Sequence, residues 1–213
     1  MIEKKRERHL LNGNINKNNL REAYVHLSDV IPSESFLTNQ GLNNEVPFHI
    51  CPYQPSVHNE VCQLIRQLTH YMNDAGKKVL EINLYDLVIE ILKKEGDWKW
   101  FQDNENTMNQ GELKEELQSI LDVENIITPT IAEKMSVAPF DVLFLTGIGE
   151  VFPYIRSHNV LNNLQKRAKE IPTLIFFPGV YQHSLAKGAS LDLFDRISDD
   201  KYYRAFNILD RAI

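Results

Sequence analysis

The chain has 213 residues, of which 43% are hydrophobic and 24% are charged, and its formal net charge is −6. This length suits one domain rather than two, and the hydrophobic content excludes a globally disordered protein. The acidic excess argues against duplex DNA as the main ligand. Two cysteines are too few for a disulfide scaffold, and no apolar run approaches the ~18 residues of a membrane span. Because the start is charged where a signal peptide needs an apolar segment, we expect a cytoplasmic protein.

The first 45 residues predict an N-terminal helical extension. A short charged helix over 3–11 ends at an asparagine-rich stretch, because asparagine side chains compete for backbone hydrogen bonds. A second helix is expected over 20–30, where apolar residues recur at spacings of three and four, and Pro32 ends it. We assign the remaining residues, 46–213, to a single α/β domain.

The next fifty residues alternate between strand and helix patterns. Residues 46–51 and 78–84 are expected to be strands, and 57–72 carries apolar residues at helical spacing. Asp86 is the expected N-cap of the following helix, which ends before Gly96. Strands that alternate with helices in this way predict parallel pairing.

The segment 97–124 combines aromatic and acidic residues. Residues 97–111 predict a polar loop with three aromatic side chains, and 112–124 predict an acidic amphipathic helix. Seven acids and one base lie between 103 and 124, which fits either a solvated surface or a docking face for a basic partner. The aromatic residues either anchor the loop to its own core or present a binding patch. The candidate partner-binding residues of this segment are Trp98, Trp100, Phe101, Glu112, Glu115 and Glu116.

The second half of the chain contains the clearest strand patterns. Residues 141–146 and 172–178 are continuous apolar runs of the kind that buried parallel strands need. One helix is expected over 130–137, before the first of these strands, and another over 151–169, between them. Residues 179–200 are expected to be rich in loops.

The order of these elements predicts a three-layer α/β sandwich with a mainly parallel sheet, resembling a degenerate P-loop or Rossmann-like domain. Residues 202–208 fit either a last strand or a last helix. Such folds bind ligands at the carboxyl ends of their strands. Any site should therefore lie among the loops at 51–53, 84–86, 146–150 and 178–181.

Those loops lack the features of triphosphate hydrolysis. A phosphate loop needs glycines, a lysine and a serine or threonine. The loop after the first strand has two prolines and no glycine, and proline removes the amide donors that would hold a phosphate. Gly147 and Gly149 are followed by Glu150 rather than by a lysine, and this carboxylate would repel an anion.

Four residues near the first strand are zinc-ligand types, namely His49, Cys51, His58 and Cys62. Structural zinc sites present paired ligands from tight knuckles, so we favour buried histidines and small apolar cysteines instead. No Gly-x-Ser-x-Gly elbow for a nucleophilic serine occurs. We therefore expect no metal, no cofactor and no catalytic residue. The alternative is a nucleotide- or metal-binding enzyme or sensor whose site lies at the strand ends.

Four segments of the chain are distinctive, namely NEVPFHICPY at 44–53, DVLFLTGIGEVFPYIRSHNVLNNL at 141–164, PTLIFFPG at 172–179 and YYRAF at 202–206. Together they resemble the BrxB family of bacteriophage exclusion (BREX) defence systems. The resemblance implies a bacterial cytoplasmic component of an antiphage system that also includes a methyltransferase, an AAA+ ATPase and PglZ. PglZ is a phosphatase-like protein and is the partner most often tied to BrxB. The family supplies no established catalytic residues.

With this resemblance, we expect a non-catalytic adaptor that binds PglZ, with other BREX components as further candidate partners. Self-association into a homodimer stays open, and neither a membrane nor a specific nucleic-acid sequence is expected as a partner. Arg156 and His158 follow the clearest strand and complete the set of candidate partner-binding residues. Arg156 can make a forked contact with a carboxylate or phosphate, or an internal ion pair.

Overall fold

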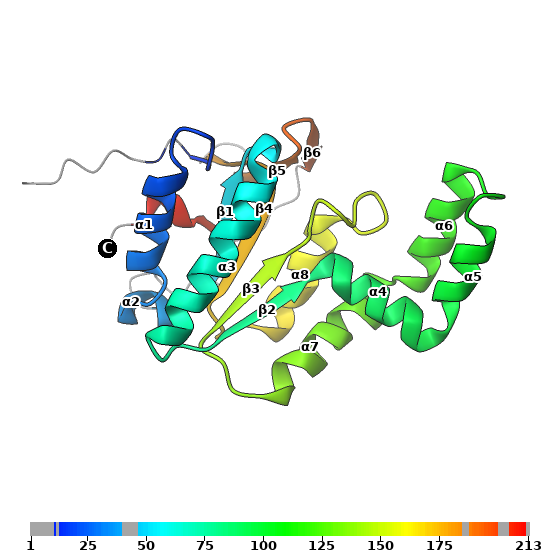
Figure 1. The fold of residues 1–213 in the computed structure, drawn as a ribbon, viewed down its shortest axis with the longest axis horizontal. Helices are drawn as coiled ribbons and strands as arrows, with labels where there is room; N and C mark the ends of the chain where they lie inside the picture. Colours follow the sequence, from blue (N-terminus) through cyan, green and yellow to red (C-terminus); the bar gives the residue numbers. More distant parts are fainter. Residues whose placement is uncertain (1–10, 12, 40–46, 185–187, 200–204, 212–213) are drawn as a thin grey trace, which may run out of the picture.

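A mostly parallel sheet runs through the middle of the molecule, with helices on both faces (Figure 1). The computed structural model describes residues 11, 13–39, 47–184, 188–199 and 205–211. The parallel strands follow the order β2-β3-β4-β1-β7. This arrangement confirms the predicted α/β fold class with its mainly parallel sheet, whereas the likeness to a P-loop or Rossmann-like domain stays a prediction.

The central strands are buried on both faces, as their continuous apolar sequences predict. Every residue of β1 and of β3 is buried. The first strand spans 48–53 rather than the predicted 46–51. Of the segment 202–208, residues 202–204 lie outside the described residues, residues 206–207 form a short strand, and a helical turn begins at residue 208. The strands are β1 (Phe48–Tyr53), β2 (Val79–Asn83), β3 (Val142–Thr146), β4 (Thr173–Ser184), β5 (Gly188–Leu193), β6 (Ile197–Asp199) and β7 (Phe206–Asn207).

The helices divide between the two faces of the sheet. On one face α1 and α3 pack against apolar side chains that include Phe144 and Phe176. On the other face α4, α7 and α8 pack against side chains that include Ile50, Leu143 and Ile175. No described helix combines the length and hydropathy needed to cross a bilayer. The helices are α1 (Leu20–Val30), α2 (Glu34–Leu37), η1 (Pro55–Val57), α3 (His58–Asp74), α4 (Leu84–Glu95), α5 (Asp97–Asn104), α6 (Gln110–Ile120), η2 (Val123–Ile127), α7 (Thr128–Val137), α8 (Ser157–Arg167) and η3 (Ile208–Asp210).

The N-terminal extension packs into the core of the sheet. The helix predicted over 20–30 is confirmed as α1, and its Leu27 is fully buried. Ile15 pairs with the end of β1, since its amide donates to the Pro52 carbonyl (2.9 Å) and its carbonyl accepts from the Gln54 amide (2.8 Å). The helix predicted over 3–11 lies outside the described residues apart from its last position. The boundary at residue 45 stays a prediction.

The predicted polar loop over 97–111 is wrong, because most of this segment is helical. Gly96 adopts the left-handed conformation (φ 90°) that ends α4, as predicted, and α5 follows directly. The Asn109 side chain accepts hydrogen bonds from the amides of Gly111 and Glu112, and Glu112 accepts one from the Asn109 amide. This capping box starts α6 two residues before its predicted beginning.

Two predicted helix starts were also displaced. Asp86 is not the N-cap of α4, because the Asn83 side chain accepts hydrogen bonds from the amides of Tyr85 (2.9 Å) and Asp86 (3.2 Å). The helix predicted from residue 151 begins only at Ser157, after a series of turns. Val151 and Ile155 are buried from those turns rather than from a helix.

The predicted loop-rich segment 179–200 contains an antiparallel extension of the sheet. The second half of β4 pairs with β5, and β5 pairs with β6. Leu191 and Leu193 are buried and alternate as a strand requires. The turn after them places Phe194 (φ 55°) and Asp195 (φ 59°) in the left-handed region, which is the geometry of a tight hairpin.

Candidate functional site

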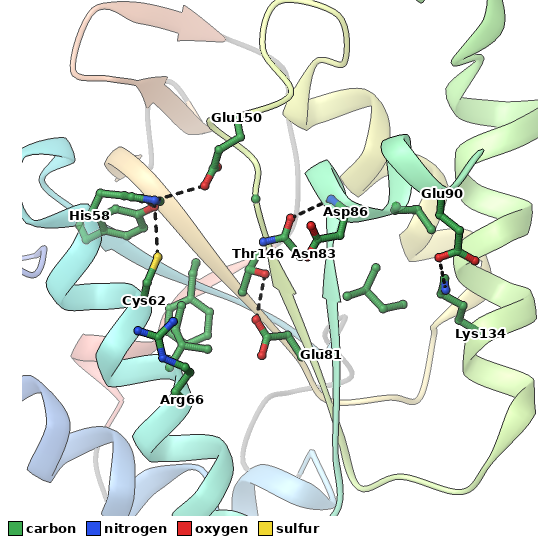
Figure 2. A pocket seen from close by; sticks show the side chains of 16 residues that line it. His58, Cys62, Arg66, Glu81, Asn83, Asp86, Glu90, Lys134, Thr146 and Glu150 are labelled. Carbon is green, nitrogen blue, oxygen red and sulfur yellow. Dashed lines mark hydrogen bonds and ion pairs between the residues drawn. The ribbon is translucent and has the colours of Figure 1, made fainter. Parts of the chain in front are cut away.

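A groove of about 460 Å³ opens at the carboxyl edge of the sheet, where α/β folds bind their ligands (Figure 2). We call it the strand-end groove. Its floor comes from β2 and β3, and its walls come from α3 on one side and from α4 and α7 on the other. The polar residues that line it are Tyr53, His58, Cys62, Arg66, Glu81, Asn83, Asp86, Glu90, Lys134, Thr146 and Glu150.

His58 is the centre of a polar network at one end of this groove (Figure 2). Its Nδ1 lies 3.0 Å from the Tyr53 hydroxyl, and its Nε2 lies 3.2 Å from Glu150 Oε1 and 3.4 Å from Cys62 Sγ. The contacts fit the tautomer in which Tyr53 donates to Nδ1 and the Nε2 proton faces the carboxylate. The first turn of α3 thus connects the ends of β1 and β3.

The electrostatics of this network do not favour a cysteine nucleophile. Burial, followed by the nearby Glu150 carboxylate, raises the pKa of the Cys62 thiol. Burial is also the main cause that raises the pKa of the Tyr53 hydroxyl, with Glu150 again adding to it. Because the thiolate is the reactive form of cysteine, a raised pKa keeps Cys62 unreactive at neutral pH.

The far end of the groove is also rich in carboxylates. Glu81 accepts a hydrogen bond from the Thr146 hydroxyl (3.1 Å), and Glu90 pairs with Lys134 (2.7 Å) across α4 and α7. Four carboxylates line the groove against two permanent cations, Arg66 among them. Such a groove repels a triphosphate rather than binding it.

Packing explains the two glycines that follow β3. Gly147 has a positive φ of 74°, and a Cβ there would collide with the Asn83 side-chain oxygen and lie 2.9 Å from the Leu84 amide nitrogen. A Cβ on Gly149 would lie 2.9 Å from Pro178 Cγ. Both glycines therefore allow the turn to approach its neighbours closely, and neither requires a bound phosphate.

The four residues considered as zinc ligands do not form one cluster. His49 is fully buried and accepts a hydrogen bond from Arg211 (3.1 Å), and Cys51 is fully buried within β1. His58 and Cys62 lie apart from this pair, at the strand-end groove. Within the part of the chain that the structure describes, no group of three or more histidine, cysteine or acidic side chains could hold a metal ion.

A second candidate surface is the helical hairpin of α5 and α6, residues 97–120, which projects away from the sheet (Figure 1). Phe101 is buried, and the Lys93 ammonium lies 5.6 Å from the ring centre of Trp98, which packs against the core. Trp100 is 45% exposed and stands edge-on to Phe101, with ring centres 5.1 Å apart. Of the three aromatic residues singled out, Trp100 therefore has the most accessible ring.

The three acidic candidates on α6 differ in what they contact. Glu112 belongs to the capping box, since its Oε2 accepts from the Asn109 amide (3.0 Å). Glu115 and Glu116 are exposed on the middle of the helix. Their carboxylates are therefore better placed than that of Glu112 to meet a partner.

The family comparison connects these surfaces to a known group of proteins. A family described as "BREX protein BrxB" matches residues 80–208. The chain belongs to the BrxB family. A BREX protein BrxB from Bacillus cereus (strain H3081.97) is 34% identical over 203 residues, which cover 90% of this chain and 100% of the relative. Another from Escherichia coli O9:H4 (strain HS) is 28% identical over 179 residues, or 84% and 86% of the two chains. No solved structure matches.

The BrxB match includes the α5–α6 hairpin and α8, which carries the last two candidate residues. Arg156 is exposed at the position before α8, and His158 is buried on that helix with 4% of its surface exposed. Neither residue lines the strand-end groove. A role in partner binding stays a prediction for both, and the buried position of His158 leaves little of its side chain for a partner to reach.

The sequence predicted where the strand-end groove lies, since the loops at 51–53, 84–86 and 146–150 all contribute to its lining, but it did not predict the contacts within the groove. His58 and Cys62 were considered as zinc ligands, and their contact with Glu150 was not foreseen. Glu81 carried the available signal, because an acid in the middle of a predicted parallel strand is unusual. Arg66 offered no such signal, since exposed arginines on helices are common.

Proposed function

We propose that this protein is a non-catalytic adaptor of a bacterial BREX antiphage defence complex and that it binds PglZ in the cytoplasm. Membership of the BrxB family supports the place in a BREX system. The carboxylate-rich groove and the protonated state favoured for Cys62 support a role other than catalysis. The observation that carries the proposal is the projecting acidic hairpin with its exposed Trp100.

The hairpin combines two features of protein-binding surfaces. An exposed tryptophan supplies a large apolar area, and such side chains dominate the energetics of many interfaces. The neighbouring acids Glu115 and Glu116 attract a basic partner and speed its encounter. Both features lie on helices that the core holds through Phe101 and Leu117, so the surface is fixed before binding.

The test measures the affinity of purified protein for PglZ of the same operon by isothermal titration calorimetry. Trp100→Ala, and separately the pair Glu115→Lys with Glu116→Lys, should each raise Kd at least about tenfold, which corresponds to ~1.4 kcal/mol. Glu112 is left unchanged because its substitution would disrupt the capping box.

The matched control reverses two exposed acids on α1, Glu22→Lys with Asp29→Lys, and should leave Kd unchanged. If the hairpin variants bind PglZ with full affinity, the hairpin is not the docking face, although an adaptor role through another surface is not contradicted. Absence of any complex between the unaltered proteins would overturn the proposed partner.

A further inference from the structure

One face of the sheet is incompletely covered by helices. Figure 1 views this face and shows α3 in front of the sheet on one side, with no helix in front of the edge strand β2. Parallel strands are normally buried on both faces. In β2, however, Glu81 is exposed and Val79 is only half-buried.

The dimensions of the fold explain this exposure. Strands lie ~4.8 Å apart and packed helices 8–10 Å apart, so one helix covers about two strands. Five parallel strands therefore need between two and three helices on each face. Among the described residues, α1 and α3 are the long helices on this face, which leaves the strip over the edge strand β2 without a helix. The strand-end groove occupies that strip.

The chemistry of the groove indicates what could fill the strip. Its apolar lining includes Ile65, Leu87 and Phe176, which suits the apolar face of a helix. The polar lining carries more carboxylates than cations, and Lys134 is already paired with Glu90 at 2.7 Å. Glu81 is held by the Thr146 hydroxyl and remains exposed. The unmatched charge is therefore negative and favours a cationic partner.

We propose that the strand-end groove is a second docking surface, whose occupant is an amphipathic helix of a partner protein that presents arginine or lysine to Glu81 and Glu150. The helix lies against β2 beside α3 and completes the helical layer on that face. This proposal rests on the adaptor function for the existence of a protein partner. It uses a surface separate from the α5–α6 hairpin, so the two can be tested independently.

The test uses photo-crosslinking in the BREX complex that forms when tagged protein is co-expressed with its operon. Benzoylphenylalanine replaces the exposed Arg66 on the groove wall, and in a matched control it replaces Tyr71, which is exposed on the same helix but does not line the groove. A third variant carries it at Trp100 on the hairpin. The expected result is a crosslink from position 66 to a partner segment with basic residues at helical spacing, and none to that segment from position 71.

The second measurement neutralises the groove. Glu81→Gln with Glu150→Gln should lower the amount of that partner that co-purifies about tenfold, because the complementary charge is lost. The control variant, Glu22→Gln with Asp29→Asn on α1, should leave that amount unchanged. Crosslinks from position 100 but not from 66 would overturn the groove proposal and leave the adaptor function standing. A crosslink from 66 to a second copy of this chain, recognised by isotope labelling, would replace the proposed occupant with self-association. Failure of any BREX component to co-purify would overturn both proposals.

Discussion

Gly147 shows how a single residue shapes the strand-end groove. It ends β3 with a positive φ of 74°, and its missing side chain leaves room for Asn83, whose oxygen caps α4. The turn after β3 and the start of the helix after β2 therefore depend on each other. Any larger residue at position 147 would therefore both strain the backbone there and displace the Asn83 side chain that caps α4.

Gly147→Ala should lower the free energy of unfolding by about 2–3 kcal/mol, as the sum of left-handed strain and a disturbed N-cap. Gly76→Ala is a matched control, because Gly76 has the same φ of 74° but no atom within 4 Å of the added Cβ. Gly76→Ala should lower the free energy of unfolding by only ~1 kcal/mol. Urea unfolding followed by circular dichroism measures both values, and equal losses would show that the contact with Asn83 contributes nothing.

At the scale of elements, the α5–α6 hairpin depends on local stop and start signals more than on the sheet. Gly96 ends α4, and the Asn109 capping box starts α6. Its buried side chains are few, Phe101 on α5 and Leu117 on α6, while Trp98, Leu113 and Ile120 are only partly buried against the core. A helix with so little burial relies strongly on its cap.

Asn109→Ala should destabilise α6 by about 1 kcal/mol, because it leaves the amides of Gly111 and Glu112 without their acceptor. Hydrogen exchange measured by mass spectrometry should become faster over 110–120 while β3 stays protected. Asn104→Ala is the control, since that side chain donates to the carbonyl of Trp100, within the last turn of α5, and does not cap α6. Unchanged exchange in the Asn109 variant would contradict the importance of the cap.

At the scale of the whole molecule, the two ends of the described chain are joined across β1. The Arg211 guanidinium donates to His49 (3.1 Å) and to the Ser35 carbonyl (2.8 Å), and the side-chain Nδ2 of Asn207 donates to the Gly13 carbonyl (2.8 Å). His49 is fully buried at this junction. Burial, followed by the charge of Arg211, lowers the pKa of His49 to about 3.

This junction predicts acid sensitivity of the fold. Between pH 6.5 and about 3, His49 is neutral in the folded protein and protonated in the unfolded chain, so acid favours unfolding. The free energy of unfolding should fall through this window by up to ~1.4 kcal/mol per pH unit from this residue. His49→Phe should reduce that slope, whatever its effect on stability at pH 7.

The slope is obtained from urea unfolding at a series of pH values from 7 to 4. His70→Gln is the control, because the His70 side chain is 80% exposed, and it should keep the slope of the unaltered protein. Identical slopes for His49→Phe and the unaltered chain would show that folding does not lower the pKa of His49.

Local patterns in the sequence predicted much of the fold. The long amphipathic helix α3, the apolar strand β3 and the end of α4 at Gly96 each follow from residues close in the chain. Hydrophobic periodicity and backbone preference act over a few residues, so they can be read without a structure. The predicted order of alternating strands and helices was therefore correct for the central sheet.

The displaced elements depended on partners distant in the chain. Leu191 and Leu193 form a strand because the extension of β4 pairs with them, and Val151 is buried from a turn rather than from a helix. The sequence by itself determined an acidic α/β protein with BrxB-like segments and with no phosphate loop at its strand ends. Only the tertiary structure decided the order of the strands, the meeting of His58 with Glu150 and the strip left uncovered over β2, because each depends on contacts between segments that no local pattern encodes.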